Sequence, residues 1–186
     1  MRIIYVIVKI ITLPGAMLHA FFEHMSCRIC KILVDDARTI RADEMLSHTE
    51  HELVKRRGAS FDLCFIPFMF NLIFGLTFLS SGAVAVLYLG SYKNVLLWFL
   101  LYMGIALLTN LFPQMEDVLM LKENVYNKNT NKLLKVLVAP FYAVFYVGAQ
   151  LERFGLTLLT SIGFAFLYPY LLGLTVPKIY ELIMAA

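Results

Sequence analysis

Residues 61–81 read FDLCFIPFMFNLIFGLTFLSS, and this stretch decides what kind of protein the chain forms. An α-helix needs about 20 predominantly apolar residues to cross the roughly 30 Å hydrocarbon core of a bilayer. The stretch meets that length with one charged residue, Asp62. The rest of the chain has a similar composition, since 60% of the 186 residues are hydrophobic, 16% are charged and the mean hydropathy is +0.75. One small soluble core could not bury this much apolar surface, so the composition indicates a polytopic membrane protein.

Four further apolar runs approach the length of a membrane span. Together with 61–81 they give the candidate spans 3–24, 61–81, 92–112, 134–150 and 155–176. The first contains Pro14-Gly15, which predicts a kinked or partly re-entrant helix. The last two are separated by so few residues that we expect a tight hairpin through 150–153. The predicted fold is an all-α, polytopic membrane helix bundle of about five spans, with residues 1–186 forming a single integral membrane domain.

Basic residues predict the orientation of the bundle. Lysine and arginine gather in the connections 25–60 and 113–133, whereas the opposite connections hold only Lys93 and Arg153. Cytoplasmic loops of membrane proteins carry the excess of positive charge, so both rich connections are predicted to be cytoplasmic. The net charge of +3 is confined to loops, which argues against nucleic acid as a partner. We expect a multi-pass protein of the cell membrane, with the lipid bilayer and a membrane protein or peptide as partners.

The cytoplasmic loop 25–60 has a helical pattern of its own. Between Arg41 and Arg57, apolar or small residues recur at 46, 49 and 53, while charged residues and two histidines fall on the other side. This pattern predicts an amphipathic helix on the membrane surface or against the bundle, with His48 and His51 on one face. The alternative is that the polar side is a solvated face without further function.

All four histidines of the chain lie between residues 19 and 51, close to glutamates, which points to metal chemistry. His19 and His24 are five residues apart and point about 140° away from each other on a helix, so they cannot bind one metal together. His19 and Glu23, by contrast, can share a helix face. The predicted site uses His24 and either His48 or His51 as zinc ligands at the cytoplasmic face, with Glu23 or Glu52 as base or ligand.

A nearby C-x-x-C pair offers a second metal hypothesis. Cys27 and Cys30 lie one helical turn apart and next to His24, which is the arrangement of a His-x-x-Cys-x-x-Cys zinc site. The alternative is that both are ordinary apolar cysteines buried in a reducing compartment.

Two segments resemble the site-2 protease family of intramembrane zinc metalloproteases. Pro14-Gly15 precedes the His-Glu segment, and Asn110-Leu-Phe-Pro113 followed by Glu116-Asp117 ends a later span, so the resemblance covers residues 12–33 and 104–121. In that family a His-Glu-x-x-His helix supplies two zinc ligands and an Asn-x-x-Pro segment leads to the aspartate that completes the site. The resemblance implies that Asp117 is the third ligand, Glu23 the general base and His24 a ligand.

Three functional hypotheses follow. The first is a metal-binding member of this fold without proteolytic activity, acting as a membrane scaffold or regulatory partner. The second is an active intramembrane zinc metalloprotease, in which zinc lowers the pKa of a bound water and Glu23 accepts its proton. The third is a small transporter or channel subunit that uses Lys9, His19 and Asn71 as its pathway. The five-residue histidine spacing departs from the protease motif and favours the first.

Overall fold

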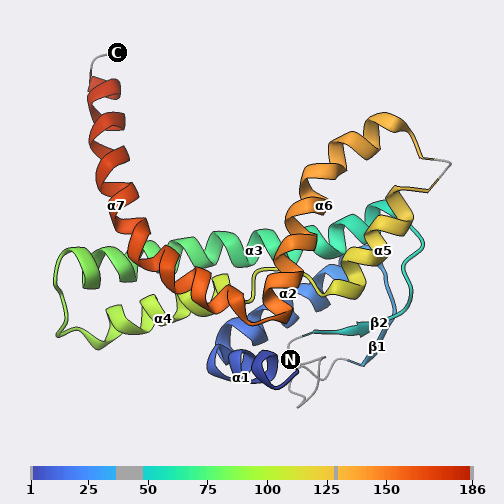
Figure 1. The fold of residues 1–186 in the computed structure, drawn as a ribbon, viewed down its shortest axis with the longest axis horizontal. Helices are drawn as coiled ribbons and strands as arrows, with labels where there is room; N and C mark the ends of the chain where they lie inside the picture. Colours follow the sequence, from blue (N-terminus) through green and yellow to red (C-terminus); the bar gives the residue numbers. More distant parts are fainter. Residues whose placement is uncertain (1, 37–47, 128–129, 185–186) are drawn as a thin grey trace.

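The computed structural model describes residues 2–36, 48–127 and 130–184 (Figure 1). It is 80% helical, which confirms the predicted all-α class. The helices of these residues are α1 (Arg2–Ile11), α2 (Leu13–Cys30), α3 (Arg57–Ala83), α4 (Val95–Thr109), α5 (Met115–Val125), α6 (Lys132–Arg153) and α7 (Leu156–Met184). A π-helical turn, η1 (Val84–Tyr88), extends α3. Two short strands, β1 (Val34–Asp36) and β2 (Glu50–His51), pair antiparallel, with Val34 opposite His51.

Three of the described helical segments are long and apolar enough to cross a membrane. They are residues Arg57–Tyr88, Lys132–Arg153 and Leu156–Gly173, and the broken pair α1 and α2 makes a fourth if it counts as one span. Helix α4 has 15 residues and rises about 22 Å, less than the hydrocarbon thickness of roughly 30 Å. The chain therefore has the helices of a membrane protein, while the count of about five spans stays a prediction. The tight connection expected at 150–153 falls just beyond, at Phe154 and Gly155, where Gly155 adopts a φ of +71°.

The first predicted span is broken, as Pro14-Gly15 indicated. Helices α1 and α2 meet at Thr12 at an angle of 95°. The Thr12 hydroxyl donates to the carbonyl oxygen of Val8, and it accepts a 2.9 Å hydrogen bond from the side-chain amide of Asn110 at the end of α4. The backbone carbonyl of Ile11 at the break accepts a 2.8 Å hydrogen bond from the Tyr102 hydroxyl of α4, so a side chain from another helix satisfies a group that the break frees.

Close packing between α2 and α4 fixes which face of α2 looks into the bundle. A Cβ atom at Gly15 would collide with the backbone carbonyl of Ala106 on α4, so only glycine permits this approach. Figure 1 shows α2 and α4 on the same side of the long helix α3, with α5, β1 and β2 gathered near one end of α3. One turn after Gly15, the same inward face carries His19, which is 1% exposed.

The amphipathic helix predicted over 41–57 is wrong for the part that the structure describes. Residues 50–51 form β2 and regular helix begins only at Arg57. The backbone N–H of Thr49 donates to Glu23 and that of Glu52 donates to Leu33, so these groups are not available for helical hydrogen bonds. Leu53, expected on the apolar face, is 80% exposed. Residues 41–47 lie outside the described part of the chain.

The two basic connections lie together, although one of them contains a helix that the sequence analysis assigned to a loop. Helix α5 occupies residues 115–125 of the connection 113–133. Its Asn124 side chain donates a 2.6 Å hydrogen bond to the carbonyl oxygen of Val54, and the Val54 N–H approaches the sulfur of Met120 at 3.1 Å. This contact agrees with a shared membrane side for both segments, and their cytoplasmic location stays a prediction.

Candidate metal centre

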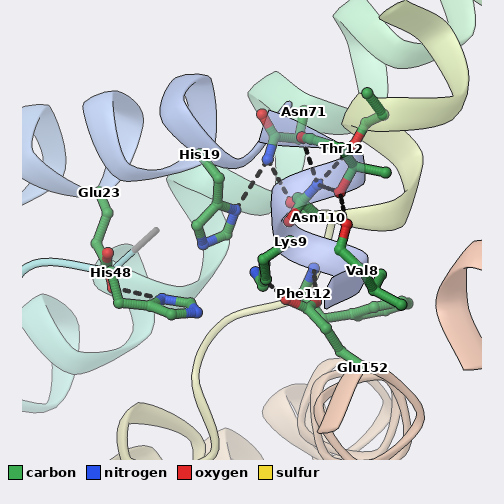
Figure 2. Close-up of polar contacts among 11 residues, drawn as sticks. Val8, Lys9, Thr12, His19, Glu23, His48, Asn71, Asn110, Phe112 and Glu152 are labelled. Atoms are coloured by element: carbon green, nitrogen blue, oxygen red, sulfur yellow. Dashed lines mark hydrogen bonds and ion pairs between the residues drawn. The ribbon is translucent and has the colours of Figure 1, made fainter. Parts of the chain in front are cut away.

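Three buried side chains bring their ligand atoms together on the inner face of α2. They are His19 and Glu23, four residues apart on that helix, and His48 from the segment before β2 (Figure 2). Their ligand atoms all lie within 4.8 Å of one another, and each residue is at most 2% exposed. This cluster, named the His19 group below, is the one set of three or more potential metal ligands found in residues 2–36, 48–127 and 130–184.

Two hydrogen bonds of Thr49, one from its backbone and one from its side chain, hold His48 over α2. The Thr49 N–H donates a 2.8 Å hydrogen bond to Glu23 Oε2, and the Thr49 hydroxyl donates to the Ala20 carbonyl at 3.4 Å. The other carboxylate oxygen, Glu23 Oε1, lies 3.5 Å from His48 Nδ1. Glu23 therefore fixes the segment with one oxygen and faces the histidine with the other.

Two ring nitrogens of the His19 group lack a hydrogen-bond partner. His19 Nε2 and His48 Nδ1 are buried without one, and the two rings meet edge to face with centroids 5.2 Å apart. Buried polar atoms are nearly always paired, so such atoms mark either a site for a bound group or an energetic cost. Two histidines and one glutamate form a common zinc donor set, and the 3.5 Å from Glu23 Oε1 to His48 Nδ1 is close to the ligand separation of about 3.4 Å in tetrahedral zinc. The residues fit a divalent transition metal.

Asn71 on α3 holds the other side of the His19 ring. Its side-chain nitrogen lies 2.8 Å from His19 Nδ1 and 2.6 Å from the backbone carbonyl oxygen of Asn110 (Figure 2). The Asn71 side-chain oxygen has no partner. The ring of His19 is thus fixed in orientation by Asn71, which makes hydrogen bonds between helices.

The His19 group contains two of the predicted site residues, Glu23, predicted as base or ligand, and His48, predicted as a ligand. His24 does not belong to the group, because the five-residue offset from His19 turns it away from this face. His19 was missing from the predicted set. The signal that could have included it was its four-residue spacing from Glu23, which places both on one helix face.

His51 and Asp117, also predicted as ligands, lie next to each other but bind one another. His51 Nε2 is 3.1 Å from Asp117 Oδ1, and His51 Nδ1 is 2.9 Å from the carbonyl oxygen of Glu52. Burial alone would lower the pKa of His51, but the hydrogen bond and charge of Asp117 outweigh it and raise the pKa to about 9. Both nitrogens face acceptors, so the ring is held as an imidazolium, which cannot bind a metal while it keeps both protons. Metal binding by this pair stays a prediction.

A second buried polar contact joins α1 to α6. Lys9 Nζ lies 2.5 Å from Glu152 Oε1, and the side chains are 1% and 6% exposed. The other oxygen, Glu152 Oε2, accepts a 3.3 Å hydrogen bond from the backbone N–H of Phe112. This ion pair could not be predicted from sequence spacing, because its partners are 143 residues apart. Glu152 and His48 both line a pocket of about 450 Å³, so the two polar regions border the same cavity.

The C-x-x-C pair belongs to an apolar cluster, and the Cys30 thiol also lies 4.0 Å from Asp62 Oδ2. Cys27 and Cys30 are free thiols that pack with Ile32, Val54 and Leu63. Neither thiol belongs to the His19 group. This environment agrees with the packing alternative for the two cysteines.

In the His-Glu-x-x-His motif the metal ligands are at i and i+4 and the general base follows the first ligand. His19 and Glu23 have that spacing, and the residue after His19 is Ala20, which carries no carboxylate. Comparison of the chain with protein-family models, curated proteins and solved structures gave no match. The resemblance to the site-2 protease family rests on the residues quoted for it.

Proposed function

We propose that the chain is a multi-pass membrane protein that binds a divalent transition metal, zinc in the simplest case, through His19, Glu23 and His48. In this proposal the fold is site-2-protease-like, and the protein acts without proteolysis as a scaffold or regulatory partner in the cell membrane. The observation that carries the proposal is the convergence of three buried donors, in which His19 Nε2 and His48 Nδ1 make no hydrogen bond and Glu23 Oε1 lies 3.5 Å from His48 Nδ1. A metal would satisfy both nitrogens at once.

The bound metal would have a structural effect that follows from the origin of its ligands. Two ligands come from α2 and the third from the segment before β2, which Thr49 already ties to Glu23. A metal would connect these two parts of the chain in addition to the two hydrogen bonds that Thr49 makes to α2. Its binding free energy would add to the stability of the fold. A partner that contacts β1, β2 or α5 would therefore meet a surface that depends on metal loading.

The absence of a base at residue 20 supports a role other than hydrolysis. In the His-Glu-x-x-His zinc hydrolases the carboxylate that accepts a proton from the metal-bound water directly follows the first ligand, where this chain has Ala20. Glu23 is proposed here as a ligand, and one carboxylate cannot be both a metal ligand and the free base that accepts a proton from the metal-bound water. The active-protease hypothesis would need another carboxylate in that role.

Metal content tests the proposal, with His24 as the matched control. Wild-type protein and the variants His19→Ala, His48→Ala and His24→Ala are purified in detergent, stripped with chelator, incubated with zinc and analysed for bound metal. We expect about one zinc per chain for wild type and His24→Ala, and loss of binding for the other two. Less than about 0.2 zinc on wild type would contradict the proposal. Loss in His24→Ala with retention in His19→Ala would instead favour the ligand set predicted from the sequence.

A further inference from the structure

The contacts of Asn71 determine which nitrogen of His19 carries the proton. The carbonyl oxygen of Asn110 can only accept, so the group that Asn71 presents to it at 2.6 Å must be its amino group. The same amino nitrogen lies 2.8 Å from His19 Nδ1 and has a second hydrogen to donate. His19 Nδ1 must then be an acceptor, and the single proton of a neutral ring is on Nε2.

This tautomer is the wrong one for a metal. His19 Nε2 is the nitrogen without a partner, and a metal bound there needs its lone pair, so the proton has to move to Nδ1. A protonated Nδ1 needs an acceptor, and the Asn71 amino group cannot serve as one. Asn71 Oδ1 can, and it is buried without a partner in this structure.

We propose that the Asn71 carboxamide is a switch that sets the metal affinity of the His19 group. As oriented in this structure, the Asn71 carboxamide holds His19 in the Nε2–H tautomer, which cannot bind a metal through Nε2. Rotation of the carboxamide by half a turn about the Asn71 Cβ–Cγ bond turns Asn71 Oδ1 toward His19 Nδ1 and stabilises the Nδ1–H tautomer, which can bind the metal. This inference rests on the proposed metal-binding function. Rotation gives up the hydrogen bond to the Asn110 carbonyl, so the network around Asn110 opposes metal binding. Asn71 is a positioning residue and does not touch the metal.

Asn71→Asp removes the need to rotate, because both carboxylate oxygens accept hydrogen bonds. The new carboxylate also faces the Asn110 carbonyl oxygen, and this repulsion lowers the stability of the fold. The repulsion is the same with and without metal, so it does not oppose metal binding. A carboxylate or carbonyl acceptor behind a metal-bound histidine changes metal affinity by about 10- to 100-fold. We expect zinc to bind Asn71→Asp at least about tenfold more tightly than wild type.

Asn124→Asp is the matched control. Asn124 also donates a 2.6 Å hydrogen bond to a backbone carbonyl, that of Val54, but it is not part of the network around His19. The zinc affinity of the Asn124→Asp variant should equal that of wild type. The nitrogen chemical shifts of His19 in wild type provide a second measurement that needs no variant to fold. We expect the Nε2–H tautomer in metal-free protein and Nδ1–H in zinc-loaded protein.

The outcomes separate this inference from the proposed function. Zinc binding by wild type with the same affinity in Asn71→Asp, or an Nδ1–H tautomer in metal-free wild type, would overturn the switch and leave the metal site standing. Zinc binding by Asn71→Asp alone would contradict the proposed function for wild type and support the switch. Absence of zinc from both proteins would overturn both.

Discussion

Two buried polar regions border the same pocket and differ in whether their polar atoms already have hydrogen-bond partners. At the α1–α6 contact, Lys9 pairs with one carboxylate oxygen of Glu152. The other oxygen accepts a hydrogen bond from the backbone N–H of Phe112. In the His19 group, by contrast, His19 Nε2 has no hydrogen-bond partner, and His48 Nδ1 makes no hydrogen bond and lies 3.5 Å from Glu23 Oε1. The first region has the contacts of a structural tie, and the second has those of a binding site. Residue type alone does not separate them, because both consist of one carboxylate and nitrogen bases; the distinction lies in which atoms are already satisfied.

The largest expected effect comes from removing one partner of the Lys9–Glu152 ion pair. Glu152→Ala leaves the Lys9 ammonium buried without its counter-charge and should lower the free energy of unfolding by about 3–5 kcal/mol. Thermal unfolding in detergent measures this. The double variant Lys9→Met with Glu152→Leu should recover most of the loss, since it removes both charges together. A single variant as stable as wild type would contradict a structural role for the pair.

The second largest expected effect is stabilisation of the protein by zinc bound at the His19 group. At a free zinc concentration of about 100 times the dissociation constant, wild type should gain about 2.7 kcal/mol relative to metal-free protein. His48→Ala should gain nothing, whereas His24→Ala should gain as much as wild type. Thermal unfolding with and without zinc is the measurement, and equal shifts in all three proteins would show that zinc binds elsewhere.

His51 extends the comparison to a histidine three residues from His48 whose nitrogens both have partners. Replacing it with glutamine removes a charge-assisted hydrogen bond to Asp117 and should cost about 2 kcal/mol near neutral pH. The pKa of His51, about 9, is above its value of about 6.5 in an unfolded chain, so its contribution is complete below about pH 6.5 and is lost as the pH rises through 9. The difference in stability between wild type and His51→Gln should therefore shrink between pH 7 and pH 9.5. A constant difference over that range would mean that the ring is uncharged throughout.

Glu23→Gln should have the smallest effect on the metal-free protein. The glutamine can keep a neutral hydrogen bond from the Thr49 N–H, so we expect a loss of about 1 kcal/mol. Zinc affinity should fall clearly, because an amide oxygen is a poorer ligand than a carboxylate. If instead zinc stays bound and cleavage of a membrane peptide by wild type is lost in the variant, Glu23 is a general base and the active-protease hypothesis is correct.

The sequence predicted the helices better than the pairing of side chains. Apolar length located α3, α6 and α7, and Pro14-Gly15 indicated the break between α1 and α2. The periodicity of α2 also showed that His19 and Glu23 can share a face and that His19 and His24 cannot. It could not show which face looks inward, because this depends on the contact of Gly15 with Ala106, a residue of another helix.

The second half of the site was beyond the reach of sequence periodicity. The spacing of 46, 49 and 53 resembled a helix, but the N–H groups of Thr49 and Glu52 bond to Glu23 and Leu33 and keep that segment extended. The extended path places His48 beside Glu23 and His51 beside Asp117, so neighbouring histidines acquire different roles. Both outcomes depend on tertiary contacts that override local preference.

A structure of the zinc-loaded wild-type protein, with the metal located by its anomalous scattering, would show directly which residues bind zinc. We expect one zinc held by His19 Nε2, His48 Nδ1 and a carboxylate oxygen of Glu23, at about 2.0–2.2 Å from each. We also expect His51 to stay paired with Asp117. Zinc held by His24 and Asp117, or no ordered zinc within reach of His19, would contradict the proposed metal site.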